Sequence, residues 1–128
     1  MKTRLFVNLL FIVIITSCAG TGEQLSLEQR LTDMNLQIGE GNVRIPRYRV
    51  NGWTPIDNRN LIITAGVSDK YLVRLSFPCL GLDGAFQIGF TTPMGSLDRF
   101  ESLLVRSLGR GRERCDIQDI FQLEKITN

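Results

Sequence analysis

Residues 61–77, LIITAGVSDKYLVRLSF, decide the fold class of this chain. The first run, LIITA, is apolar and rich in β-branched residues, and alternate residues from Tyr71 to Phe77 fall on one face of a strand. Residues 66–69 (GVSD), between the two runs, have the composition of a turn. The stretch therefore predicts an antiparallel hairpin.

Alternation that is typical of strands continues on both sides of this hairpin. Phe86, Ile88 and Phe90 alternate with small or polar residues, which predicts a half-buried strand. Earlier in the chain, Arg47 and Arg49 are expected to project from one face of a strand. Residues 109–114 (GRGRER) have the composition of a polar loop. Further strands are predicted at residues 43–53, at residues 100–107 and, after a short turn beyond Asp116, at the end of the chain.

An amphipathic helix is predicted before these strands, at residues 27–38. Ser26 followed by Gln29 forms the pattern of a capping box at its start, and Gly39 and Gly41 supply a stop. We expect its apolar stripe to pack on the core of the domain, and a partner-binding or membrane-lying helix is the alternative. The stripe consists of Leu27, Leu31, Met34 and Ile38.

These elements predict an α+β fold that is mostly β. In this fold the N-terminal helix packs on a small antiparallel sheet of five or six strands, which curls into a partly closed barrel. A hairpin-rich sheet that the helix flanks without such closure is the alternative. Trp53 is expected to pack in the small core rather than to bind a ligand.

The first residues have the organisation of an export signal. A positive segment (MKTR) precedes an apolar one at residues 5–15, well short of the roughly 20 residues that span a bilayer. Ile15-Thr16-Ser17-Cys18 then resembles the lipobox of bacterial lipoproteins. An ordinary secretory signal or an uncleaved anchor is the alternative. The pattern predicts a signal peptide at residues 1–17, lipidation of Cys18, a short tether at residues 18–25 and one small β-rich domain at residues 26–128.

Lipidation of Cys18 would anchor the domain to a membrane of the cell envelope. Each buried methylene of an acyl chain contributes about 0.8 kcal/mol, so two or three chains hold a protein stably. By resemblance to the sorting rule of Gram-negative envelopes, Ala19 in place of an aspartate favours the outer membrane. We therefore expect a lipid-anchored protein on the periplasmic face of the outer membrane, with the membrane as a partner through Cys18.

The charge balance of the chain argues against nucleic acid as a ligand. The formal net charge is +2, but Lys2 and Arg4 leave with the signal peptide, so that 13 basic residues balance 13 acidic ones. The chain has no histidine, which is the commonest general base and metal ligand. The sequence therefore predicts no cofactor, no metal site and no recognisable catalytic residue.

Two cysteines, Cys79 and Cys115, remain once Cys18 is lipidated. An even pair in an oxidising compartment predicts a disulfide. In the chain-entropy model, a disulfide that closes a loop of about 36 residues stabilises the folded state by about 4 kcal/mol. Two buried thiols or a metal pair are the alternatives, and a metal would need further ligands.

Six short motifs, in order, resemble a family of small uncharacterised proteobacterial lipoproteins that carry a domain of unknown function. The likeness covers about residues 43–123, and it implies that the two later cysteines belong to the framework of the domain. It implies no activity. The motifs are Gly52-Trp53, Asp57 with Leu61-Ile62-Ile63, Tyr71-Leu72-Val73-x-Leu75, Cys79-x-Gly81-Leu82, Ile88-Gly89-Phe90 and Cys115-x-Ile117-x-x-Ile120.

Four arginines around the GRGRER segment are the candidate binding residues. Guanidinium groups can hold phosphate or carboxylate groups through bidentate forks, and lipid A phosphates, anionic glycans or an acidic partner are the candidate ligands. A solvated loop whose arginines pair with Glu113 and Asp116 is the alternative. The candidates are Arg106, Arg110, Arg112 and Arg114.

The function that the sequence predicts is a non-enzymatic, lipid-tethered domain that binds or supports another envelope component, such as a protein or an anionic glycan. An arginine-based binder of anionic polymers or lipids is one alternative. A carboxylate-dependent hydrolase is another, and it requires two of four acidic residues to meet in one cleft. Turn caps are the simpler interpretation of these residues. They are Asp57, Asp83, Asp98 and Glu101.

Overall fold

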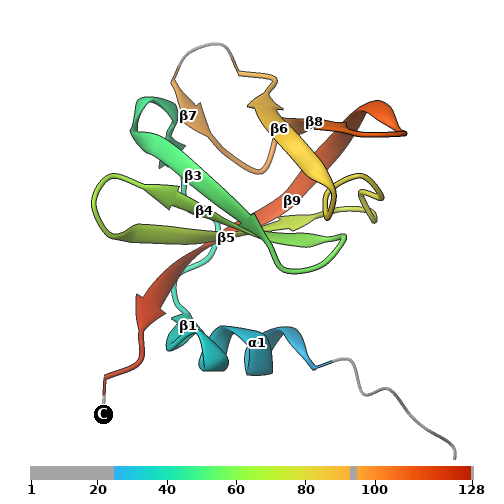
Figure 1. Ribbon diagram of the computed structural model, residues 1–128. Helices are drawn as coiled ribbons and strands as arrows, with labels where there is room; N and C mark the ends of the chain where they lie inside the picture. Colours follow the sequence, from blue (N-terminus) through green and yellow to red (C-terminus); the bar gives the residue numbers. More distant parts are fainter. Residues whose placement is uncertain (1–24, 93–94, 128) are drawn as a thin grey trace, which may run out of the picture.

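The computed structural model describes residues 25–92 and 95–127. The predicted signal peptide, Cys18 and most of the predicted tether lie outside these ranges. Within them, one helix precedes nine strands, and no helix is long and apolar enough to cross a membrane (Figure 1). The elements are α1 (Leu27–Asp33), β1 (Leu36–Ile38), β2 (Ile45–Pro46), the 3-10 helix η1 (Arg47–Arg49), β3 (Val50–Pro55), β4 (Asn60–Ala65), β5 (Asp69–Leu75), β6 (Ala85–Phe90), β7 (Ser96–Leu97), β8 (Ser102–Ser107) and β9 (Gly111–Lys125).

Most of the strands belong to one curled antiparallel sheet. Six strands follow the order β3-β4-β5-β9-β8-β6, while β1 pairs with the end of β9 and β2 pairs separately with β7. Strand β9 pairs with β5 on one side and with β8 on the other, and the sheet curls along it. The edge strands β3 and β6 therefore lie on the two sides of one opening (Figure 1). The predicted fold, α+β and mostly β with a partly closed barrel, is confirmed.

The hairpin predicted at residues 61–77 is present. Residues 60–65 of β4 pair with residues 69–74 of β5 around a turn at residues 66–68, where Gly66 has a φ of +61°. Tyr71 and Leu75 are buried as expected, but Phe77 lies beyond the end of β5 and is 74% exposed. The prediction that Phe77 shares the buried face is therefore wrong, because the strand ends at Leu75.

Both faces of this hairpin are buried. Ile63 and Val73 point into the barrel and belong to its main hydrophobic cluster. Ile62 and Leu72, on the opposite face, pack in a second cluster with Leu31 of α1. Helix α1 therefore covers the outer face of the sheet (Figure 1), and the expectation that its apolar stripe packs on the domain holds for Leu27 and Leu31 but not for Met34, which is 45% exposed.

The helix begins where the sequence predicts and ends earlier. Ser26 and Gln29 form the capping box, each accepting from the other's backbone N–H. The helix stops at Asp33, and Asn35 takes a left-handed φ of 61°, which asparagine tolerates better than most residues. The predicted continuation to residue 38 is wrong, because the chain reverses at Asn35 and residues 36–38 pair with β9 as strand β1.

The longest strand, β9, replaces a predicted loop and a predicted turn. Residues 111–116 pair with β8, and residues from Ile117 onward pair with β5. A β-bulge shifts the register, since Arg74 lies opposite Asp119 while Leu75 lies opposite Ile117. The bulge places the inward residues Ile117 and Ile120 three positions apart, a spacing that resembles a helix turn.

The predicted strand at residues 43–53 is interrupted. Pro46 ends the two-residue strand β2, and the 3-10 helix η1 follows it before β3 begins. Arg47 and Arg49 therefore do not project from one strand face, and Arg49 pairs instead with Asp69 at 2.8 Å. Trp53 packs against the main cluster, as expected for a core residue.

Candidate functional site

Strand register brings three of the four candidate arginines to one face of the sheet. β8 and β9 form a hairpin in which Arg106 lies opposite Arg112, and Leu104 lies opposite Arg114. On β6, Gln87 lies opposite Arg106. Directly opposed residues share a face, and so do residues two apart on one strand, so these side chains lie together on the outer face of β6, β8 and β9.

The turn between β8 and β9 fixes this arrangement. Ser107 pairs with Gly111 across residues 108–110, and both Gly109 and Gly111 have positive φ values, of 84° and 68°. Such angles suit a tight hairpin loop and are strained for other residues. Arg110 lies in this turn and does not line the hollow that the other three arginines border.

The arginines border a shallow hollow of about 420 Å³ with an apolar floor. Leu104 contributes a partly exposed side chain to it. Gly89 on β6 has none, and a Cβ added there would meet Leu104 only at ordinary contact distance, 3.8 Å from its Cβ. The face therefore combines cationic groups with a small apolar surface, and we call it the arginine face (Gln87, Gly89, Leu104, Arg106, Arg112 and Arg114).

The three guanidinium groups differ in how far they are engaged. Arg106 Nη1 donates to Gln87 Oε1 at 3.1 Å. Arg114 Nε donates to Ser102 Oγ at 3.2 Å and lies 3.5 Å from Asp116 Oδ1. Among the residues that the structure describes, the guanidinium group of Arg112 makes no ion pair and no hydrogen bond.

Negative charge gathers at the Arg114 end of the arginine face. The hydroxyls of Thr92 and Thr91, with the charge of Arg114, hold the pKa of Glu101 below its usual value. Thr91 Oγ1 donates to Glu101 Oε2 at 2.7 Å, which stabilises the ionised form. Asp116 and Glu101 thus offset Arg114, and the positive end of the face is the Arg106–Arg112 pair.

Two of the four candidate carboxylates line one cleft, which is the arrangement that the hydrolase alternative requires, and the other two lie elsewhere. Asp57 and Asp83 line one cleft of about 550 Å³, while Asp98 and Glu101 belong to the turn before β8, where Glu101 N–H donates to the carbonyl of Asp98 at 3.1 Å. The carboxylate of Asp57 accepts from Asn60 with both oxygens, at 2.8 to 3.0 Å. Asp57 is therefore a turn cap, as expected, and its oxygens are engaged within the turn.

The predicted disulfide joins Cys79, in the loop after β5, to Cys115 on β9, with 5.8 Å between the Cα atoms. Glu113, two residues before Cys115, has one carboxylate oxygen 3.9 Å from Cys79 Sγ. The composition of residues 109–114 predicts a loop, so the position of Glu113 beside the disulfide is not expected from the sequence. Strand alternation in β9, which places residues 113 and 115 on one face, is the signal that would have found it.

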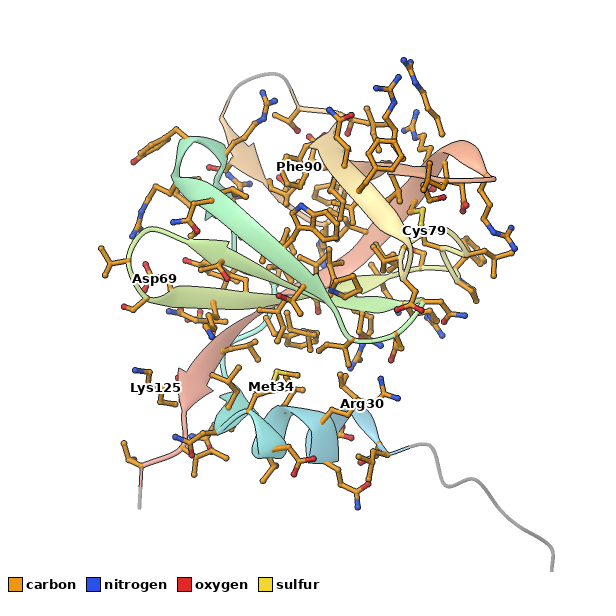
Figure 2. The ribbon with its side chains drawn as sticks, viewed as in Figure 1. Arg30, Met34, Asp69, Cys79, Phe90 and Lys125 are labelled. Carbon is orange, nitrogen blue, oxygen red and sulfur yellow. A yellow bond between two sulfur atoms is a disulfide. The ribbon has the colours of Figure 1, made fainter. Side chains whose placement is uncertain are left out.

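A third hollow, of about 430 Å³, lies where the barrel is not closed. Gly52 and Trp53 of β3 line one side, and Ile88 and Phe90 of β6 line the other. Figure 2 shows Phe90 at the upper end of β6, near the open edge of the sheet. The arginine face lies on the outer side of β6, and the two hollows adjoin at Gly89, which lines both.

Comparison with known proteins places the chain in a family without assigning it an activity. Residues 1–127 match a family described as "Family of unknown function (DUF6491)". No curated protein and no solved structure matches the chain. The match confirms the expected domain of unknown function, while lipidation and envelope location stay predictions. Because the match covers nearly the whole sequence, the chain belongs to this family of unknown function, DUF6491.

Proposed function

We propose that the protein is a lipid-anchored, non-enzymatic binding domain of the bacterial envelope, and that its arginine face holds an anionic glycan. The observation that carries the proposal is the convergence of Arg106 and Arg112, from two strands, beside an apolar hollow. The predicted signal peptide and the lipobox that ends at Cys18 support the envelope location.

The chemistry of the arginine face suits phosphate or carboxylate groups. A guanidinium group presents five N–H donors in a planar fork that matches these anions, and that of Arg112 has no partner among the described residues. Gln87 engages one nitrogen of Arg106 and leaves further donors for a ligand. The anion would bind at this end rather than beside Arg114, where Asp116 repels it.

The position of the face in the molecule favours a glycan over the anchoring bilayer. The described chain begins just before α1, and the β8–β9 hairpin lies at the other end of the molecule in Figure 1. A domain tethered before α1 would therefore present the arginine face away from its own anchor. The apolar floor at Leu104 offers contact to the carbon face of a sugar ring.

The test compares two charge-matched double variants of the full chain in mild detergent. Arg106→Gln/Arg112→Gln removes two cations from the arginine face, and Lys70→Gln/Lys125→Gln removes two exposed cations elsewhere. Lys125 lies at the end of β9 that is remote from the hairpin (Figure 2). Binding to a soluble polyuronate is measured by calorimetry, with neutral dextran as the control ligand.

We expect the arginine variant to bind about tenfold more weakly, since two exposed ion contacts contribute about 0.7 kcal/mol each. The lysine variant should bind like the wild type, and wild-type affinity should fall as salt screens the contacts. Equal losses in both variants, or affinity that is insensitive to salt, would contradict the proposal.

A further inference from the structure

A cluster of metal-ligand atoms lies on the inner side of the β8–β9 hairpin, opposite the arginine face. The Sγ atoms of Cys79 and Cys115 and a carboxylate oxygen of Glu113 all lie within 4.8 Å of one another. Both cysteines are buried, and Figure 2 shows Cys79 beside the strands that carry the arginine face. The three residues come from two segments that the disulfide joins.

Two buried oxygens beside this cluster have no hydrogen-bond partner in the described part of the chain. They are Glu113 Oε1 and Ser107 Oγ, and Ser107 is only 5% exposed. A Cβ on Gly81 would stand 2.5 Å from Ser107 Oγ and 2.7 Å from Glu113 Oε1, so the glycine leaves room for both. Leaving such a group unpaired in a protein interior costs about 1–3 kcal/mol. A bound cation would satisfy both oxygens.

We propose that this cluster becomes a binding site for a zinc-class divalent cation when a dithiol opens the disulfide. The dithiol supplies two electrons and two protons, becomes a disulfide itself, and leaves Cys79 and Cys115 as thiols. The cation then displaces one proton from each thiol and binds both thiolates together with the carboxylate of Glu113. Ser107 Oγ or a water molecule supplies the fourth ligand.

The geometry and the charge of the cluster fit this class of metal. Zinc takes thiolate sulfur at about 2.3 Å and carboxylate oxygen at about 2.0–2.2 Å, so tetrahedral ligand atoms stand about 3.8 Å apart. The two sulfur atoms, bonded in the disulfide, must separate to this spacing once the bond opens, and the carboxylate oxygen of Glu113 already lies within 4.8 Å of both. Two thiolates and one carboxylate favour zinc or cobalt over magnesium or calcium, which prefer oxygen ligands.

The site gives the metal a structural role that the disulfide otherwise fills. Both the bond and the metal would tie the loop after β5 to β9 beside the hairpin. A reduced chain would therefore keep its hairpin when zinc is present and would loosen it when zinc is absent.

Cobalt(II) is the probe, because thiolate ligation gives it an intense near-ultraviolet band and tetrahedral geometry gives it visible bands. The full chain in detergent is reduced with dithiothreitol, freed of reductant under anaerobic conditions and titrated with cobalt(II). Glu113→Gln tests the carboxylate ligand, and Glu124→Gln, an exposed carboxylate on the same strand, is the matched control. Cys79→Ser/Cys115→Ser removes both sulfur ligands.

The reduced wild type and Glu124→Gln should bind one cobalt ion with both sets of bands, and the oxidised chain should bind none. Glu113→Gln should bind at least about tenfold more weakly, since even outer-shell changes cost that much. The proposal is overturned if the reduced chain gives no thiolate band, if Glu113→Gln binds as tightly as the wild type, or if the double serine variant still binds. If circular dichroism shows that reduction unfolds the chain, zinc must restore the native spectrum, and failure to do so also overturns it.

Discussion

Replacement of Leu31 by alanine tests the claim that the sheet has two buried faces and that α1 covers the outer one. Leu31 is 1% exposed and packs against Ile62 and Leu72 in the cluster beneath the helix. Buried Leu→Ala changes cost about 2.7–5 kcal/mol, according to the cavity that remains. Because α1 is short and can shift toward the sheet, we expect a loss of about 2–3 kcal/mol for Leu31→Ala.

Met34→Ala is the matched control for this change. The sequence places Leu31 and Met34 on the same apolar stripe, but Met34 is 45% exposed in the structure. Met34→Ala should lower the free energy of unfolding by at most about 0.5–1 kcal/mol. Urea denaturation of the full chain, followed by the fluorescence of Trp53, measures both losses, since Trp53 packs on the barrel core. Equal losses for the two variants would refute the assignment of Leu31 to a buried interface.

Three further predictions concern the disulfide, the anchor and one carboxylate. Cys79→Ala/Cys115→Ala should lower the free energy of unfolding by about 4 kcal/mol under non-reducing conditions, and an unchanged melting temperature would contradict a framework role. Cys18→Ala should abolish acylation and membrane pelleting, and intact-mass analysis of a wild-type mature chain that starts elsewhere would contradict the lipobox assignment. The pKa of Glu101 is lower in the folded chain than its ordinary value of 4.5, so its ionised form stabilises the fold. The wild type should therefore have a larger free energy of unfolding than Glu101→Gln at pH 7. This difference should vanish as the pH falls below 4.5. A difference between these two proteins that does not change with pH would show that the ionised carboxylate has no part in it.

The fold class could be predicted because local patterns and tertiary packing agree through most of the chain. The central hairpin alternates apolar residues around a turn that contains Gly66, and the capping box of Ser26 and Gln29 marks the helix start. The helix end could not be placed, because the apolar residues of strand β1 continue the helical spacing of α1. Only the left-handed backbone at Asn35 separates the two elements.

Strand β9 could not be predicted from the sequence, for two physical reasons. Glu113 occupies an inward position, so that the alternation of polar and apolar residues is lost at the start of the strand. A bulge then shifts the inward positions near Gln118, where the spacing changes from two residues to three. The bulge has no local sequence signal, since it depends on the neighbouring strands, and alternation with Cys115 reveals the inward position of Glu113 only once residues 111–116 are taken as a strand.

The candidate arginines could be named from the sequence, but their convergence could not. Arg112 and Arg114 share a face only because residues 111–114 are a strand, and Arg106 joins them only through the hairpin register. The same register separates Arg110, which lies in the turn. The metal-ligand cluster on the other side of the hairpin depends on the same strand, which brings Glu113 beside the disulfide.

The most direct test of the account is a map of where an anionic glycan contacts the protein. Backbone amide shifts of the isotopically labelled full chain in detergent are followed during titration with an oligouronate. The account predicts the largest shifts on the outer positions of β6, β8 and β9, at Gln87, Leu104, Arg106 and Arg112. Shifts confined to α1 or to the opening between β3 and β6, or no shifts at all, would contradict it.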